Sequence, residues 1–137
     1  MKSLLFLITI LLFSVNNFSI EPDEIIGVYW SPDKNGKIEI YNVGEKYFGK
    51  IIWGTKSGKD IHNPDPELRE RDVIGMVILH DFVYDGDDTW KGGTIYDPQT
   101  GKTYQSRMNL DDQGNLQVRG YIGIPLIGRT ETFTRID

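Results

Sequence analysis

The sequence contains no cysteine among its 137 residues. This absence excludes disulfides, thiolate metal sites, a cysteine nucleophile and a lipidated N-terminal cysteine. A domain of about 115 residues without disulfides must fold through apolar burial alone, which is feasible at this size. Histidine is also scarce: with His62 and His80 alone, a zinc site would have to complete its ligand set with carboxylates.

Long apolar runs are confined to the N-terminus, where Lys2 precedes a largely apolar run from Leu4 to Phe13. One positive charge followed by about 7–15 apolar residues is typical of a secretory signal peptide, whereas a membrane-spanning helix needs about 20. We therefore expect residues 1–20 to be removed on export, leaving residues 21–137 as one domain without a membrane span. A retained N-terminal anchor is the alternative.

The chain has no cluster of basic residues. Residues 1–20 contain Lys2 and no acid, so their removal leaves 14 basic and 20 acidic residues and a net charge of −6. Nucleic acids and anionic lipids are recognised by clustered lysine and arginine. We therefore expect no nucleic-acid partner. The acidic balance suits a soluble protein, and we expect a monomer.

Helix signals are sparse, because the 15 glycines and 6 prolines recur at short intervals and interrupt any 3.6-residue pattern. Period-two alternation, bounded by turn residues such as Asp111-Asp112-Gln113-Gly114-Asn115, instead indicates half-buried antiparallel strands. The expected strands are 25–30, 36–43, 46–53, 73–82, 89–96, 102–110, 116–122 and 128–136.

About eight strands joined mostly by short hairpins predict an all-β fold, a single small antiparallel up-and-down barrel, because closure removes exposed strand edges. The connection from Gly54 to Arg71 is the exception. Loops longer than about 12–15 residues are uncommon and often functional. We expect this loop to cover one mouth of the barrel and to carry a short helical turn within 66–73.

No constellation of residues indicates catalysis. None of the serines lies on the constrained turn of a Gly-x-Ser-x-Gly motif, and the acids cluster in turns, where solvated carboxylates are common. Asp60, Asn63 and Asp65 could offer oxygen ligands to calcium, but the spacing, turn glycine and closing glutamate of a calcium hand are missing. We expect neither an enzyme nor a bound metal or cofactor.

Large and small residues alternate along the predicted strand 46–53, where Tyr47, Gly49, Ile51 and Trp53 are expected to share one face. An eight-stranded barrel is just wide enough to be filled by side chains or to hold one small ligand. The sequence fits both arrangements, and each leads to a different function.

The first hypothesis is a binder or carrier of a small, largely apolar ligand. Trp53, Trp90 and Tyr104 would supply apolar wall, and Arg129 would orient a polar head, as in pockets that combine apolar lining with a few placed polar groups.

The second hypothesis is an envelope interaction protein with a filled barrel. A protein or cell-wall partner would bind the 54–71 loop, because binding residues concentrate on loops held by a rigid scaffold. The contact candidates are Asp60, Asn63, Asp65, Arg69 and Arg71.

A series of ordered segments spans nearly all of residues 25–137. They include Ile25-Ile26-Gly27-Val28-Tyr29, Tyr47-Phe48-Gly49-Lys50-Ile51-Ile52-Trp53, Asp60-Ile61-His62-Asn63-Pro64-Asp65, Trp90-Lys91-Gly92-Gly93-Thr94-Ile95-Tyr96-Asp97-Pro98 and Arg119-Gly120-Tyr121-Ile122-Gly123. Together they resemble the bacterial domain of unknown function known as DUF2147.

The resemblance implies an exported protein in the periplasm or cell envelope of a Gram-negative bacterium, with a lipocalin-like (calycin-type) barrel and no established activity. In lipocalin-like barrels an early Gly-x-Trp and a late arginine plug one end. Tyr29 stands at the position of that tryptophan, so the resemblance implies a plug of Gly27, Tyr29 and Arg135, with the cation resting on the aromatic face.

Overall fold

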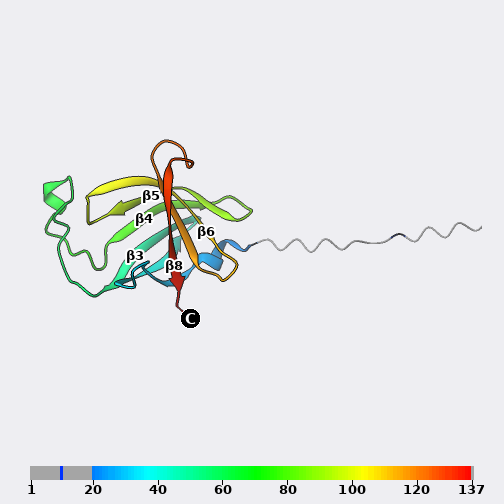
Figure 1. Cartoon of the computed structure of the whole chain (residues 1–137), viewed down its shortest axis with the longest axis horizontal. Helices are drawn as coiled ribbons and strands as arrows, with labels where there is room; N and C mark the ends of the chain where they lie inside the picture. The colour runs from blue at the N-terminus through cyan, green and yellow to red at the C-terminus, as the bar shows by residue number, and fades with distance from the viewer. Residues whose placement is uncertain (1–9, 11–19, 137) are drawn as a thin grey trace, which may run out of the picture.

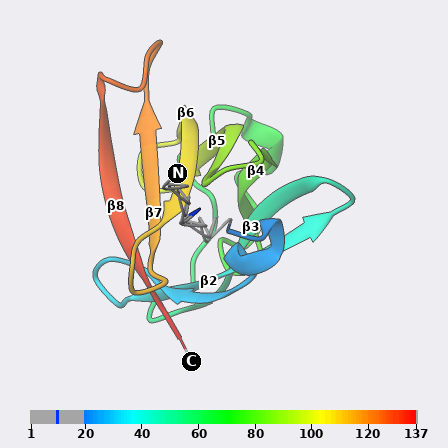
Figure 2. The same ribbon diagram turned by 90° about the vertical axis from the view of Figure 1, so that its right-hand side faces the viewer.

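Eight antiparallel strands form one closed barrel in the computed structural model, which describes residues 10 and 20–136 (Figures 1 and 2). Each strand pairs with the next in the chain, and the last pairs with the first. In order the strands are β1 (Gly27–Trp30), β2 (Gly36–Val43), β3 (Lys46–Gly54), β4 (Val77–Tyr84), β5 (Thr89–Asp97), β6 (Lys102–Leu110), β7 (Leu116–Tyr121) and β8 (Gly128–Arg135). The predicted up-and-down barrel is confirmed, whereas the predicted signal peptide lies almost entirely outside the described residues.

Two short 3-10 helices accompany the strands: η1 (Pro22–Ile25) and η2 (Pro66–Leu68). The helical turn expected within 66–73 is therefore present, as η2. The strand expected from residue 73 instead begins at Val77, because Gly75 adopts a φ of +95° and its amide donates to the Ile51 carbonyl. Residues 55–76 thus form one long β3–β4 connection, at the left of Figure 1.

The N-terminal segment closes one end of the barrel, called here the closed end. The indole Nε1 of Trp90 donates to the Pro22 carbonyl at 3.2 Å, and the Tyr47 hydroxyl donates to Asp23 Oδ1 at 2.6 Å. The Tyr84 hydroxyl donates to the carbonyl of Ile20. Successive connections of an up-and-down barrel alternate between its two ends. The β2–β3, β4–β5 and β6–β7 turns therefore lie at the closed end.

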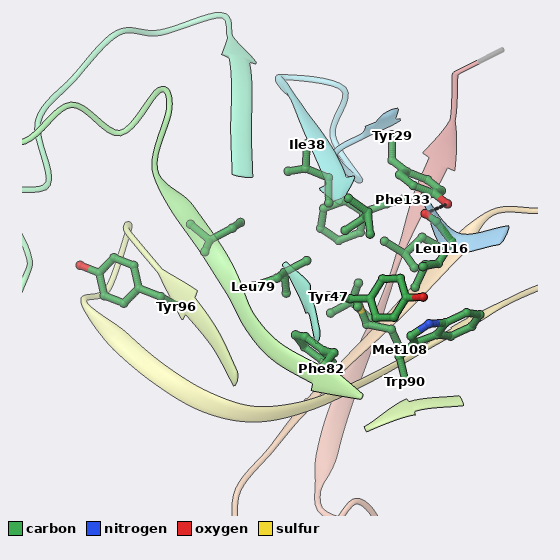
Figure 3. Close-up of a cluster of buried hydrophobic side chains, with 14 of the residues drawn as sticks. Tyr29, Ile38, Tyr47, Leu79, Phe82, Trp90, Tyr96, Met108, Leu116 and Phe133 are labelled. Atoms are coloured by element: carbon green, nitrogen blue, oxygen red, sulfur yellow. Dashed lines mark hydrogen bonds between the residues drawn. The ribbon is translucent and has the colours of Figure 1, made fainter. Parts of the chain in front are cut away.

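Large side chains pack the interior near the closed end (Figure 3). Tyr29, Phe82 and Trp90 are completely buried there, and Trp90 lies against both Tyr84 and Tyr47, with ring centroids 4.9 and 6.3 Å apart. These bulky residues need small neighbours: a Cβ on Gly93 would lie 2.5 Å from the Phe82 ring and 2.6 Å from the His80 carbonyl oxygen. The glycine is therefore part of the packing.

We predict that Gly93→Ala destabilises the barrel by about 1–3 kcal/mol, because the added methyl group overlaps a buried ring and a backbone carbonyl. Chemical unfolding monitored by circular dichroism would measure the loss. Gly58→Ala is the matched control, since a Cβ there meets nothing within 4 Å. Equal unfolding midpoints for the two variants would contradict the packing role of Gly93.

Candidate functional site: a cavity at the open end of the barrel

The opposite end of the barrel, the open end, contains a cavity of about 1220 Å³ that opens to solvent. The β1–β2, β3–β4, β5–β6 and β7–β8 connections all contribute to its rim. Its deeper wall is apolar and consists of Ile38, Ile51, Ile78, Ile95, Val118 and Phe133. The cavity therefore presents an apolar interior behind a mixed polar rim.

The barrel is hollow at this end because its inward-facing residues are smaller than those at the closed end. Leu116, Val118 and Gly120 follow one another on the inner face of β7. Gly120 is the smallest of the three and lies nearest the mouth. A Cβ at Gly120 would meet Ile95 and Tyr104 only at ordinary van der Waals distances, 3.6 and 3.7 Å. The filled barrel of the second hypothesis is thus realised over only part of its length.

Strand β8 places two charges on the cavity wall. Phe133 pairs with inward-facing Leu116, and both are buried, so alternation turns Glu131 and Arg129 to the same inner face. Their side chains lie 3.6 Å apart at the closest N–O pair and remain partly exposed, 44% for Glu131 and 86% for Arg129. This pair gives the apolar cavity a polar, accessible edge.

The sequence interpretation included Arg129 but did not place Glu131 at the site. Period-two alternation along β8 carries that information: Arg135 is the expected plug residue, and Arg129 and Glu131 share its parity.

Three of the four candidate pocket residues, Trp53, Tyr104 and Arg129, border the cavity, and Trp90 does not. Tyr104 and Arg129 line the cavity. Trp90 lies buried at the closed end, where its indole donates a hydrogen bond to the Pro22 carbonyl, and it does not line the cavity. Trp53 stands at the rim, 41% exposed.

The expectation that Trp53 shares a face with Ile51 is wrong. Lys37 pairs with Trp53 but its neighbour Ile38 pairs with Ile51, which is the signature of a β-bulge. The extra residue turns Trp53 to the outer face, where its ring packs edge-on against Trp30 at 5.9 Å and Lys37 lies over both rings.

The three residues of the expected plug do meet. The Arg135 guanidinium lies over the Tyr29 ring, 5.1 Å from its centroid, and Nη2 donates to the Tyr29 hydroxyl at 2.7 Å. The same nitrogen donates to the carbonyls of Glu24 and Ile26. A Cβ on Gly27 would lie 3.4 Å from Nη2, so the glycine packs directly beside the guanidinium.

The Tyr29 hydroxyl in turn donates to the Ile25 carbonyl at 2.8 Å. Burial raises the pKa of Tyr29, against the lowering effect of the Arg135 charge, so the hydroxyl keeps the proton that it donates. Arg135, Tyr29 and η1 therefore form one hydrogen-bonded unit that closes the barrel.

The five loop candidates form an internal network centred on the buried carboxylate of Asp60. Its Oδ1 accepts from the Tyr96 hydroxyl at 2.6 Å, and its Oδ2 accepts from Asn63 at 2.8 Å and from Arg71 Nε at 3.1 Å. Arg69 Nε donates to the Asn63 carbonyl, and Asp65 Oδ1 accepts from the Glu67 amide. All five residues thus hold the loop itself together.

This network fixes the middle of the loop to strand β5, and Tyr96 accordingly points away from the main core cluster in Figure 3. At the base, Lys59 pairs with Asp72 through a strand bridge and a 2.7 Å ion pair. Only the two ends of the loop, including Thr55, Lys56, Val73 and Ile74, line the cavity mouth. The loop therefore borders the mouth and is anchored beside it.

Two further observations concern the residues that the structure describes. Among them, no three histidine, aspartate or glutamate side chains converge as a metal site would require. No helix in this part of the chain has the length and apolar character needed to cross a membrane.

We predict that Tyr29→Phe lowers the free energy of unfolding by about 1–2 kcal/mol, because the Ile25 carbonyl and Arg135 each lose a buried hydrogen-bond partner. Thermal or urea unfolding would measure the change. Tyr41→Phe removes the same hydroxyl from a ring on the outer face, where Tyr41 stacks on Phe48, and should leave stability nearly unchanged. A loss as large in the control would show that the plug geometry is not the cause.

The Asp60 network predicts a pH dependence. Burial opposes ionisation of Asp60, but the hydrogen bonds from Tyr96, Asn63 and Arg71 outweigh it, and the pKa is lowered in the folded protein. Asp60 therefore stabilises the fold above about pH 4, the usual pKa of unfolded aspartate, and this contribution is lost as pH falls through the lower folded pKa.

We expect Asp60→Asn to lower the free energy of unfolding by about 1–3 kcal/mol at neutral pH and to lose less stability than the parent protein on acidification to about pH 3. Unfolding curves over this pH range would test both effects. Asp33→Asn removes an exposed carboxylate and should retain the acid-induced loss. Parallel pH profiles for Asp60→Asn and the parent would contradict the assignment.

A family model described as "Uncharacterized protein conserved in bacteria (DUF2147)" matches residues 27–135. Among solved structures, the chain is similar to protein HP1028 from Helicobacter pylori, which is described as belonging to the lipocalin family. The two are 28% identical over 82% of this chain and 83% of that one, with a TM-score of 0.77. No curated protein matches the chain.

The predicted likeness in sequence and in barrel architecture is thus confirmed. The family model covers the chain from the first strand to the last. The chain belongs to the DUF2147 family and folds as a lipocalin-like barrel.

Proposed function

We propose that this protein binds one small, largely apolar ligand in the open end of its barrel and carries it in the cell envelope. The observation that supports this proposal is the open cavity with its apolar wall. Ligand sites in proteins commonly measure about 300–1,000 Å³ and combine apolar lining with a few polar groups. At about 1220 Å³, the cavity and its rim offer enough space for a ligand of this size.

The distribution of polar groups suggests how such a ligand would lie. Isoleucine, valine and phenylalanine line the deep wall, whereas Arg129, Glu131 and Tyr104 line the part nearer the mouth. An apolar body would enter first, and a polar end would remain beside Arg129 and Glu131. The free-energy cost of desolvating Arg129, Glu131 and the polar end of the ligand would be small, because all three stay in contact with water at the rim.

The alternative function, partner binding through the 54–71 loop, receives less support. Asp60 and Asn63 are 0% and 6% exposed, and the other three candidates are engaged in hydrogen bonds within the loop. The two buried candidates are out of reach of a partner, and the three exposed ones already serve to hold the loop together. We therefore propose a binding role in the cavity, without catalysis, for a protein exported after loss of residues 1–20.

We predict that Gly120→Leu reduces the affinity for an apolar fluorescent probe, such as anilinonaphthalene sulfonate, by at least about tenfold, because the new side chain occupies the cavity. The fold should survive, since the first added carbon meets its neighbours at ordinary contact distances. Fluorescence titration would give the affinity, and circular dichroism would check the fold.

Thr132→Leu is the matched control: it adds the same side chain on the outer face of β8, where Thr132 is exposed. Its affinity should equal that of the parent protein. Native mass spectrometry of protein purified from the envelope fraction would complete the test, because a carrier should show a discrete extra mass that denaturation removes. Equal probe binding by Gly120→Leu and Thr132→Leu, together with a clean unliganded mass, would exclude the cavity as the binding site.

A further inference from the structure

The connection between β7 and β8 exposes an unusual group of aliphatic side chains, called here the β7–β8 tip (residues 122–127). Ile122, Ile124, Leu126 and Ile127 are 71%, 52%, 83% and 66% exposed, and the tip contains no charged residue. Figures 1 and 2 show this orange hairpin projecting beyond the rest of the barrel. Contiguous exposed apolar residues of this kind mark interaction sites.

The exposure of the tip is fixed by hydrogen bonds. Arg119 on the outer face of β7 donates through Nε to the Pro125 carbonyl at 2.6 Å, and through Nη2 to the Leu126 carbonyl at 3.4 Å. Its Nη1 donates to Thr130 Oγ1 at 2.8 Å. Within the tip, the Ile127 amide donates to the Ile124 carbonyl at 3.1 Å. The aliphatic side chains are thus held outward on a braced hairpin.

The charges of the molecule are distributed unequally between its two ends. The closed end carries nine carboxylates in residues 21–24, 43–46, 85–88 and 111–115, against the single base Lys46. The connections at the open end, residues 31–36, 55–76, 98–101 and 122–127, carry six acids and five bases. A negatively charged or zwitterionic surface would therefore be approached by the open end, with the acidic end turned away.

The size and chemistry of the tip favour a bilayer over a protein partner. A stable protein interface takes about 20–30 residues from each side, whereas the tip offers six residues on one projecting hairpin. Insertion of aliphatic side chains into the interfacial region of a bilayer needs no complementary partner surface, and its strength scales with the apolar area buried. We propose that the β7–β8 tip docks the protein on a lipid bilayer surface, with the open end facing the membrane.

Docking in this way would bring the cavity mouth to the bilayer, because Ile122 and Ile127 of the tip also line the cavity. Arg129, at the base of the hairpin, would lie near the headgroups. Because the overall charge is negative, the contact should depend on apolar insertion more than on anionic lipid. It does not require an occupied cavity, and so it goes beyond the proposed function.

The absence of cysteine allows a site-specific test. Leu126→Cys and Val43→Cys, labelled with an environment-sensitive fluorophore, place one probe on the tip and one at the closed end, where Val43 is 65% exposed. The protein should begin at Ile20, because the apolar run before it would itself bind lipid, and all eight strands and the core lie in residues 20–136. Vesicles would contain either phosphatidylcholine alone or phosphatidylethanolamine with phosphatidylglycerol.

A blue shift at residue 126 with both kinds of vesicle, and none at residue 43, is the expected result. No shift at residue 126, or shifts of the same size at both positions, would overturn the proposal. A shift at residue 126 without vesicles, accompanied by a doubled mass in gel filtration, would identify a dimer contact and would likewise overturn it.

A pair of variants tests the contribution of the side chains. The double variant that combines Ile122→Ser and Leu126→Ser should reduce vesicle co-sedimentation at least about tenfold. The matched control is the double variant with Val43→Ser and Val83→Ser, which removes two exposed aliphatic side chains from the closed end. Its vesicle co-sedimentation should equal that of the parent protein. Equal co-sedimentation by the two double variants would overturn the proposal. Probe binding to the cavity, measured without vesicles, reports separately on the proposed function.

Discussion

The barrel is closed by a seam between β1 and β8 that is the shortest of its strand contacts. Two residue pairs are in register there, Tyr29 with Arg135 and Trp30 with Thr134, whereas β7 and β8 share six. The side chain of Arg135 compensates for this short ladder by donating hydrogen bonds to Tyr29, to the carbonyl of Glu24 within η1 and to the carbonyl of Ile26 just after it. Closure of the sheet and capping of one barrel end are therefore the same set of interactions.

Because that plug fills one end, the two halves of the barrel can differ in what they contain. The aromatic residues Tyr29, Tyr47, Phe82 and Trp90 fill the space next to η1, and they need glycine at positions such as 93 to fit. The opposite half is lined by aliphatic residues and Gly120 and stays hollow. A tightly packed half can thus support a half that stays hollow.

Much of this architecture could be predicted from the sequence, because strands such as β6 and β7 alternate clearly and the turns contain Asp, Asn and Gly. The bounds of β2 and β6 were predicted to the residue. Trp53 was placed on the wrong face, because a bulge inserts one residue without a distinctive sequence signal. The start of β4 was also missed, because Val73 and Ile74 continue the apolar pattern up to Gly75.

The candidate site was harder to predict than the fold. The face of Trp90 does not follow from alternation, because the register of β5 shifts between Trp90 and Gly93. Its place at the filled end depends on the contact with Pro22, 68 positions away. The burial of Asp60 similarly depends on Tyr96, 36 positions away. Local sequence indicates an acid in a polar loop; only tertiary contacts make that acid a structural centre.

The anchoring of the long loop also bears on the kinetics of any exchange through the mouth. Asp60 ties the middle of the loop to Tyr96, and Lys59 and Asp72 clamp its base, so the longest segment at the rim is held in place. Entry through a fixed aperture needs no slow opening step, and its rate is set by diffusion and orientation. Residence time would then depend on the fit of the ligand to the aliphatic wall.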